Sequence, residues 1–296
     1  MPYVEFPPDP SLAHLIKCVW NYEAGAAETD GRPERIVPDG NPELVIHYGH
    51  PFSEYTPEQR KQLQPRAFMM GQMTRPLALD PSHGAPGIMG VRFHPAGSRA
   101  MIGAAMDEFT DQRLDVEDIA PGRTASLVDE IASAPDAAAR AAVLQRFVAQ
   151  FANAHARFQD PTVTHWTAQI QRANGRRSIA RLAQDAGLSV RQLERRFRTQ
   201  VGVTPRQYAN VIRFRTVFDM LNGGTKPDWI GLALGAGYFD QSHMIRDFQR
   251  FLGCSPTAFM TQLRGLSAVL VGLDEETACR VITRRTAAGW QSSPVP

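Results

Sequence analysis

An internal repeat in the last third of the chain constrains the fold more than any other feature of the sequence. The stretches 179–197 and 230–248 each carry an Ala four residues before a Gly: Ala183 and Gly187 in the first, Ala233 and Gly237 in the second. A small side chain lets two helices cross closely, and Gly adopts the left-handed conformation that ends the first helix. The repeat therefore predicts two copies of one helical hairpin.

The second helix of each copy begins at a polar capping residue, Ser189 or Asp240. Equivalent positions then lie 51 residues apart: Leu193/Met244 and Phe197/Phe248 on the apolar face, and Arg195/Arg246 on the polar face. The spacing predicts amphipathic helices at about 189–198 and 240–250. This is the helix-turn-helix pattern, whose second helix enters the major groove. The turn of the second copy is one residue longer, with Phe239 as the extra residue.

The charge distribution supports a nucleic-acid partner. Residues 165–262 hold 14 Lys and Arg against 6 Asp and Glu, a net charge of +8, whereas the rest of the chain carries −6. A basic segment attached to a mildly acidic one is typical of a polyanion-binding module beside a second domain. A solvated basic surface would give the same imbalance, so the charge alone does not decide the function.

Length and composition narrow the remaining classes. A chain of 296 residues suits two domains, and its three scattered cysteines form no CxxC pair, which argues against a zinc knuckle or a disulfide framework. There is no apolar run of about 18 residues and no secretory leader at the N-terminus. We expect a cytoplasmic protein with no membrane association, no bound metal and no cofactor.

The fold class predicted from these patterns is α+β. A β-rich domain with helices, barrel or sandwich-like, is expected at residues 1–110, and an all-α double helix-turn-helix domain at 161–264. Residues 111–160 are Ala-rich and predicted helical, either as a linker or dimerisation segment or as a cover for the first domain. A tail follows at 265–296, in which 268–271 has the composition of a strand.

Short periodic stretches give the elements of the N-terminal part. Strands are predicted at 34–37, 43–48, 67–71 and 87–93, between turns rich in Pro, Gly and Asp. The apolar spacing of residues 12, 15, 16 and 19 predicts a helix over 11–20, capped by Ser11. Further helices are predicted after Pro95 as far as Met106, and at 115–119, 125–132 and 137–156.

Residues 176–263 resemble the DNA-binding domain of the AraC/XylS family of transcription regulators. The resemblance rests on Gly237-Tyr238-Phe239-Asp240-Gln241-Ser242-His243-Met244, on Arg246, Phe248, Phe251, Gly253, Ser255, Pro256 and Phe259, and in the first copy on Phe197, Gly202, Thr204, Pro205, Tyr208 and Arg213-Phe214-Arg215. It implies two helix-turn-helix units joined by one long helix over 205–221. Their recognition helices would lie in successive major-groove segments, roughly 34 Å apart.

The resemblance, carried over position by position, also implies the residues that read DNA. The base-reading candidates are Arg191, Glu194 and Arg195 in the first unit, and Gln241, Ser242 and Arg246 in the second. Arg pairs with guanine, Gln with adenine, and Glu accepts from cytosine. Gln192, Arg198 and His243 are expected to touch phosphate or to be solvated. Arg196 is expected to point toward the scaffold.

The N-terminal part resembles, over residues 3–120, an uncharacterised domain found in a subset of the same family. The motifs are 35–46 and 90–97. Other relatives carry a cupin-like effector-binding barrel at this place. Arg92, His47 and His94 are therefore the effector-binding candidates. A structural ion pair of Arg92 with Asp39 or Glu43 is the favoured alternative, and the closely spaced HxH pattern of a metal cupin is absent.

The sequence thus predicts a DNA-binding transcription regulator and not an enzyme. The expected partners are double-stranded DNA, a small-molecule effector, RNA polymerase and a second copy of the chain. A rival class is a repair protein with a sacrificial cysteine, which needs an activated thiolate that Cys18, Cys254 and Cys279 do not offer. No GxSxG, HExxH, GxGxxG or Walker motif is present, so no catalytic residue is assigned.

Overall fold

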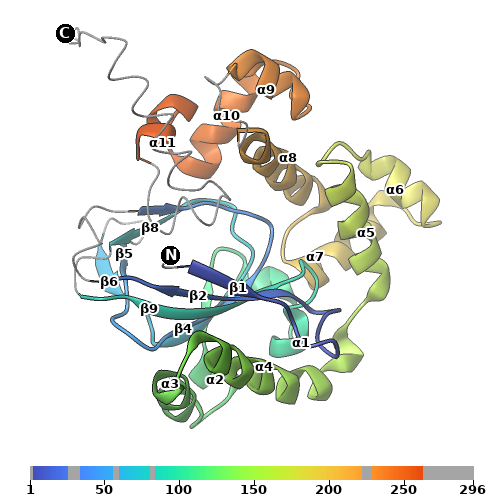
Figure 1. Ribbon diagram of the computed structural model, residues 1–296. Coiled ribbons are helices and arrows are strands. Elements are labelled where there is room, and N and C mark those ends of the chain that lie inside the picture. The colour runs from blue at the N-terminus through green and yellow to red at the C-terminus, as the bar shows by residue number, and fades with distance from the viewer. Residues whose placement is uncertain (1–2, 26–33, 56–59, 81–83, 222–227, 263–296) are drawn as a thin grey trace, which may run out of the picture.

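The computed structural model describes residues 3–25, 34–55, 60–80, 84–221 and 228–262. In this part of the chain, two antiparallel sheets are followed by a succession of helices (Figure 1). The larger sheet has the order β1-β2-β9-β4-β7-β10 and the smaller one β3-β8-β5-β6. The strands are β1 (Tyr3–Phe6), β2 (Ile16–Glu23), β3 (Glu34–Ile36), β4 (Glu43–His47), β5 (Ser53–Tyr55), β6 (Lys61–Leu63), β7 (Ala67–Met70), β8 (Leu77–Asp80), β9 (Gly87–Phe93) and β10 (Arg113–Asp115).

The larger sheet is buried on both faces because it separates two hydrophobic cores. Side chains alternate along a strand, so Leu44 and Ile46 of β4 face one core while Val45 and His47 face the other. The inner core lies between the two sheets and contains Trp20, Phe52, Phe68, Leu79 and Ile88. We call these two sheets with their connections the sheet domain, residues 3–115.

Helices cover the outer face of the larger sheet. They are α1 (Arg99–Ile102), α2 (Val116–Ile119), α3 (Thr124–Ser133) and α4 (Ala137–Ala154), whereas the 3-10 turn η1 (Met106–Phe109) packs against the C-terminal helix α7 (Val190–Val201). Leu144, Phe147 and Val148 of α4 belong to the same core as Leu44 and Ile46 of β4. Figure 1 shows α2, α3 and α4 together on the side of the sheet that faces away from the C-terminal helices.

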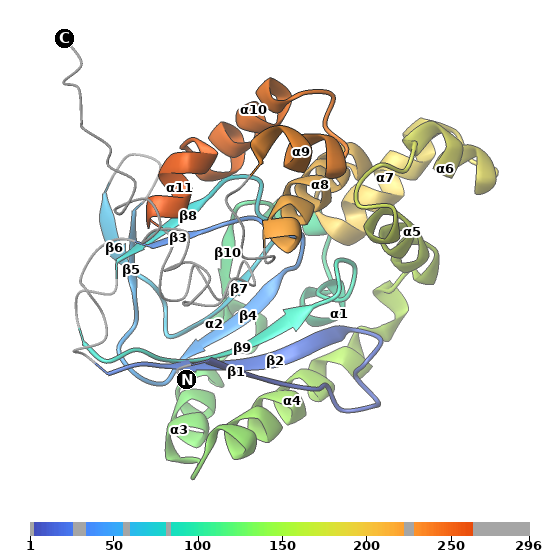
Figure 2. The ribbon, with the colours of Figure 1, turned by 45° about the horizontal axis from the view of Figure 1, so that its top comes forward.

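The described residues of the C-terminal part, 156–221 and 228–262, form helices joined by turns. The chain runs through the 3-10 turn η2 (Ala156–Phe158), α5 (Pro161–Arg172), α6 (Ile179–Asp185), α7 (Val190–Val201), α8 (Pro205–Leu221), α9 (Trp229–Gly235), α10 (Gln241–Leu252) and α11 (Pro256–Gln262). The first unit, α5–α7, and the second, α9–α11, have separate cores, and both cores include residues of α8. The long helix therefore joins two helix-turn-helix units, as the sequence predicted (Figure 2).

The sheet domain packs directly on both units. Val37, which follows β3, lies in the core of the second unit, and Ala96, which follows β9, lies in the core of the first. Gly40 sits against α8 so closely that a Cβ there would lie 2.9 Å from the Tyr208 ring. The C-terminal helices therefore contact the sheet domain at both units and at α8.

Most of the predicted elements are confirmed, including the four strands and the helices at 115–119, 125–132 and 137–156. The helix predicted over 11–20 is wrong. Residues 10–15 form turns, and β2 begins at Ile16 between β1 and β9. Because β2 is buried on both faces, its continuous apolar run lacks the alternation that identifies a half-exposed strand. The strand predicted at 268–271 lies outside the described residues.

Candidate nucleic-acid interface

The first recognition helix, α7, has clear signals at both ends. Ser189 caps it in a capping box: the Ser189 hydroxyl accepts a hydrogen bond from the Gln192 amide, and the Gln192 side chain accepts one from the Ser189 amide at 2.9 Å. Leu193 and Phe197 are fully buried. Gly202 ends the helix in the left-handed region with φ +100°. The helix is therefore fixed along one face and at both ends.

The second recognition helix, α10, repeats this design 51 residues later. Asp240 caps it by accepting a hydrogen bond from the His243 amide at 2.7 Å. Met244 and Phe248 are fully buried, and Phe248 packs its ring against Phe214 of α8 at 5.0 Å between centroids. Gly253, the equivalent of Gly202, ends the helix with φ +69°. The two recognition helices are structural equivalents.

Each recognition helix presents an exposed polar stripe on the face opposite its core. Residues spaced by four and then three positions lie on one side of a helix. In α7 that stripe is Arg191, Arg195 and Arg198, and in α10 it is Ser242, Arg246 and Gln249; all six side chains are exposed. Among the described residues, the four arginines of these stripes have no ion-pair partner. Their guanidinium groups are free to bind a polyanion.

The other predicted DNA-contacting residues lie at the edges of these stripes. Glu194 and Gln241 are half-buried. The Gln192 side chain is engaged in the capping box, and the His243 ring stands edge-on to Tyr238 at 5.1 Å. Contacts by Gln192 and His243 would therefore compete with interactions within the domain.

The positions of Arg196 and Gln249 bear on the predicted set of DNA-contacting residues. Arg196 points toward the scaffold as expected, where its guanidinium pairs with Asp160 at 2.7 Å. Gln249 was not among the predicted residues. It is exposed and occupies the position equivalent to Arg198, so the 51-residue repeat contained the signal that identifies it.

The far ends of both recognition helices are bonded to the sheet domain. The Thr110 hydroxyl donates a hydrogen bond of 2.6 Å to the carbonyl of Gly202, which ends α7. The Arg35 guanidinium donates to the carbonyl of Leu252, the last residue of α10. These contacts leave the N-terminal parts of both helices uncovered.

A cleft lies between the sheet domain and the end of α10. It has a volume of about 640 Å³ and is walled on one side by Leu252 and Gly253. The opposite wall combines apolar and charged side chains: Met70, Met73, Pro76, Leu77, Arg35, Arg75, Arg113, Glu54 and Asp111. Both acidic groups are engaged, because Glu54 pairs with Arg113 and Asp111 accepts from the Thr74 amide and hydroxyl. With three arginines against two carboxylates, the lining of the cleft carries a net charge of +1.

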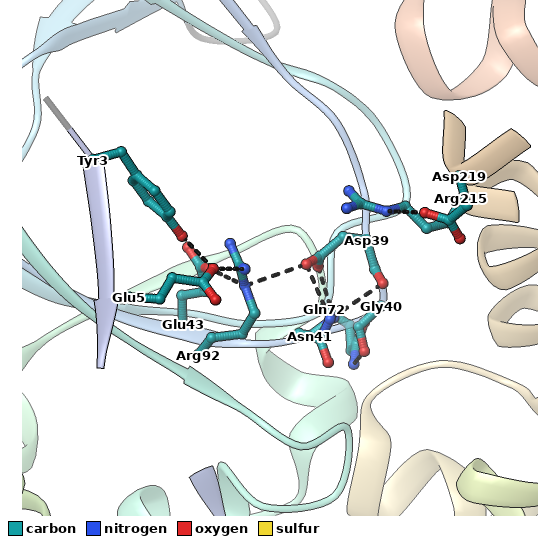
Figure 3. A network of polar contacts seen from close by, with 10 residues as sticks. All are labelled: Tyr3, Glu5, Asp39, Gly40, Asn41, Glu43, Gln72, Arg92, Arg215 and Asp219. Atoms are coloured by element: carbon teal, nitrogen blue, oxygen red, sulfur yellow. Dashed lines mark hydrogen bonds and ion pairs between the residues drawn. The ribbon is translucent and has the colours of Figure 1, made fainter. Parts of the chain in front are cut away.

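Arg92 lies in a buried ion network of the sheet domain (Figure 3). Its Nε lies 2.8 Å from Glu43 and 3.5 Å from Asp39, and its Nη1 lies 3.4 Å from Glu5. Burial by itself would lower the pKa of Arg92, but the Glu43 and Asp39 carboxylates outweigh it and the pKa is raised. Figure 3 also shows Arg215 and Asp219 of α8 beside the Asp39 side of this network. The alternative that Arg92 forms a structural ion pair is confirmed.

The two predicted histidines lie in different places. His47 is fully buried between the sheets, 3.1 Å from the Gln64 amide oxygen, and burial lowers its pKa to about 4. It lines an interior cavity of about 60 Å³ together with Glu43 and Trp20. His94 follows β9 and lies 3.2 Å from the Ala13 carbonyl, outside that cavity. No group of three or more metal-ligating side chains occurs among the described residues.

Two family models match the chain. A domain of unknown function (DUF6597) matches residues 4–115, and a helix-turn-helix domain matches residues 182–262. No helix in the described ranges is both long and apolar enough to cross a bilayer. No curated protein matches the chain.

Solved structures that superpose on this chain include two of ToxT from Vibrio cholerae. An apo variant is 13% identical over 83% of this chain and 97% of that one, with a TM-score of 0.47. Wild-type ToxT bound to an unsaturated fatty acid is 13% identical over 84% and 96%, with a TM-score of 0.48. A probable AraC family transcriptional regulator from Rhodopseudomonas palustris is 23% identical over 36% of this chain and all of that one, with a TM-score of 0.31.

The match to residues 182–262 and the paired recognition helices define the class of the protein. The chain carries a helix-turn-helix domain, which places it among DNA-binding transcription regulators. Its C-terminal part contains the helix-turn-helix domain that the sequence predicted, and residues 4–115 match a domain of unknown function.

Proposed function

We propose that the protein reads a specific DNA site by placing α7 and α10 in successive major-groove segments on one face of the duplex. The observation that carries this proposal is the pair of equivalent exposed stripes on helices joined by α8. Arg191, Glu194 and Arg195 act in one half-site. Gln241, Ser242 and Arg246, with Gln249 added, act in the other.

The two half-sites differ in sequence under this proposal. The stripe of α7 consists of arginines, which favour guanine, whereas α10 combines one arginine with Gln and Ser side chains that also suit adenine. An asymmetric site of two unequal halves, about one helical turn apart, is expected. Arg198, Gln192 and His243 contribute contacts to phosphate.

Selection of bound fragments from genomic DNA by the full chain tests this proposal. The enriched fragments should share two short motifs separated by about 10 base pairs. Arg195→Ala should relax base preference in one motif and Arg246→Ala in the other. Enrichment without any shared motif, or equal loss in both motifs from either variant, would refute the assignment of one helix to each half-site.

We also propose that the N-terminal domain senses a small effector and passes the signal through the contacts at Thr110 and Arg35. These bonds reach the C-terminal ends of both recognition helices, so a shift of the sheet domain changes the relative orientation of α7 and α10. The DNA-reading ends stay free in either state. Sensing in this arrangement needs no contact between effector and DNA.

The cleft beside α10 is the effector site that the geometry favours. The cavity lined by His47 and Glu43 is about 60 Å³, whereas sites for small molecules measure roughly 300–1,000 Å³. The cleft of about 640 Å³ falls in that range. Arg75 has no ion-pair partner among the described residues, and Arg35 bonds to a neutral carbonyl at Leu252. A carboxylate or phosphate would compete for Arg35 and release the end of α10.

A thermal-shift screen of the full chain with small mono- and dicarboxylates and phosphate esters tests the effector site. A compound that raises the melting temperature should no longer do so in the double variant Arg35→Gln/Arg75→Gln. It should still do so in Arg146→Gln, because Arg146 of α4 forms an exposed ion pair with Glu130. A hit that survives the double variant but is lost in His47→Gln or Arg92→Met would return the site to the interior of the sheets. A hit lost only in His94→Gln would place it at the end of β9.

A second copy of the chain and RNA polymerase are two further partners that we propose for a transcription regulator. Sedimentation of the full chain, free and with DNA, tests for a homodimer. Transcription in vitro from a promoter carrying the selected site tests for action on RNA polymerase. Action on chromosomal DNA agrees with the cytoplasmic location expected from the sequence.

A further inference from the structure

The turn of the second helix-turn-helix unit contains an inserted aromatic residue. Both turns close with the same hydrogen bond: the Leu188 amide donates to the Ala183 carbonyl at 3.0 Å, and the Tyr238 amide donates to Ala233 at 2.9 Å. Leu188 and Tyr238 are therefore equivalent. Because the caps Ser189 and Asp240 follow one and two residues later, Phe239 is the residue without a counterpart.

Phe239 lies outside the hydrophobic cores that the described residues form. An apolar residue directly before a helix cap commonly packs on the fourth residue of the helix. In the first unit, Leu188 is partly buried against the core that contains Leu193. In the second unit, Tyr238 takes the inward position in the core that contains Met244, and Phe239 is turned out with 87% of its surface exposed.

The position of Phe239 beside the base-reading end of α10 identifies its partner. It directly precedes the Asp240 cap, and the exposed stripe of Ser242 and Arg246 begins two residues after that cap. N-terminal residues of a recognition helix contact base edges, and the methyl group of thymine is the apolar feature of the major groove.

We propose that Phe239 is a specificity-determining residue that packs on a thymine methyl group in the half-site read by α10. The inference rests on the proposed DNA-binding function and adds an apolar contact to it. It also gives the second unit a means of reading an A·T pair that the first unit lacks, since Leu188 is turned toward its own core. Burial of one methyl group corresponds to about a fourfold change in affinity.

Replacement of single thymines by deoxyuridine in the selected DNA site tests the proposal, because this change removes only the methyl group. The wild-type chain should lose about fourfold in affinity at one thymine, located in the half-site whose preference Arg246→Ala relaxes. Phe239→Ala should bind the thymine site about fourfold more weakly and should no longer distinguish thymine from deoxyuridine. Because the side chain is exposed, this variant should fold like the wild type.

Leu234→Ala is the matched control, since Leu234 is another exposed apolar residue of the same unit, 56% exposed on α9. It should keep the full response to deoxyuridine. The proposal is overturned if Phe239→Ala retains the wild-type response at every thymine. It is also overturned if the variant binds DNA normally but loses transcription, which would assign Phe239 to a protein partner. A wild-type chain that binds no DNA site would refute the proposed function itself, and this inference with it.

Discussion

Arg246→Ala is the substitution that tests the docking of α10 most directly. The Arg246 guanidinium is exposed and has no ion-pair partner among the described residues, so DNA binding breaks no bond within the protein. Arg196, in contrast, would have to leave Asp160. A bidentate contact of Arg with guanine contributes about 1–3 kcal/mol, so the Kd should rise roughly 5- to 150-fold.

Arg250→Ala is the matched control in the same helix. Arg250 is exposed one turn later and stacks its guanidinium over the Phe251 ring at 5.2 Å. A contact from this position reaches phosphate, so its loss should weaken binding to all sequences alike and lower the salt slope by about 1. Both side chains are exposed, so the free energy of unfolding should change by less than about 0.5 kcal/mol.

Fluorescence anisotropy with the selected site and its single-base variants, at several salt concentrations, measures both effects. Arg246→Ala should flatten the preference at one base pair, whereas Arg250→Ala should leave every preference intact. Equal losses from the two variants, with base preference unchanged in both, would refute the orientation of α10 in the groove.

The remaining predictions concern stability, measured as the free energy of urea unfolding. Gly187→Ala should lower the free energy of unfolding by about 1 kcal/mol, because the φ of Gly187 is left-handed at +66°, although a Cβ there meets nothing within 4 Å. Gly202→Ala should lower it further, since its Cβ would lie 3.0 Å from the Met106 carbonyl oxygen. Burial lowers the pKa of His47 to about 4, so His47 binds a proton more readily in the unfolded chain. The free energy of unfolding should therefore fall as the pH drops from about 6.5 to 4, and this fall should be smaller in His47→Gln. Arg92→Met leaves the part-buried carboxylates of Glu43 and Asp39 unpaired and should lower the free energy of unfolding by about 3 kcal/mol, whereas Arg146→Met in an exposed pair should lower it by less than about 1 kcal/mol.

The C-terminal units were predictable because their signals are local. A cap, an apolar spacing and a terminal Gly lie within about 20 residues of one another, and the repeat presents them twice. Gln249 was not predicted because the DNA-contacting residues of the second unit were inferred from the family motif. Its equivalence to Arg198 is visible only in the 51-residue repeat.

The sheet domain was harder to predict because its elements depend on distant partners. β5 and β6 are three residues long and include Glu54 and Lys61, so they show no apolar alternation and exist only through pairing. The run from Leu12 to Val19 suits a helix, yet pairing with β9 makes its second half, from Ile16, a strand. The contact between Arg35 and Leu252 joins residues 217 positions apart, a separation at which periodicity carries no information.

The two interdomain bonds differ in a way that bears on regulation. Gly202 and Gly253 are equivalent ends of the recognition helices, yet the first packs against the Met106 carbonyl and the Thr110 hydroxyl, while the second borders a cleft. A close-packed contact resists displacement, and a contact beside a cleft of about 640 Å³ can yield to a ligand. We therefore expect α7 to keep its position on the sheet domain while α10 moves. An effector would then change the reading of one half-site and leave the other as an anchor on the DNA.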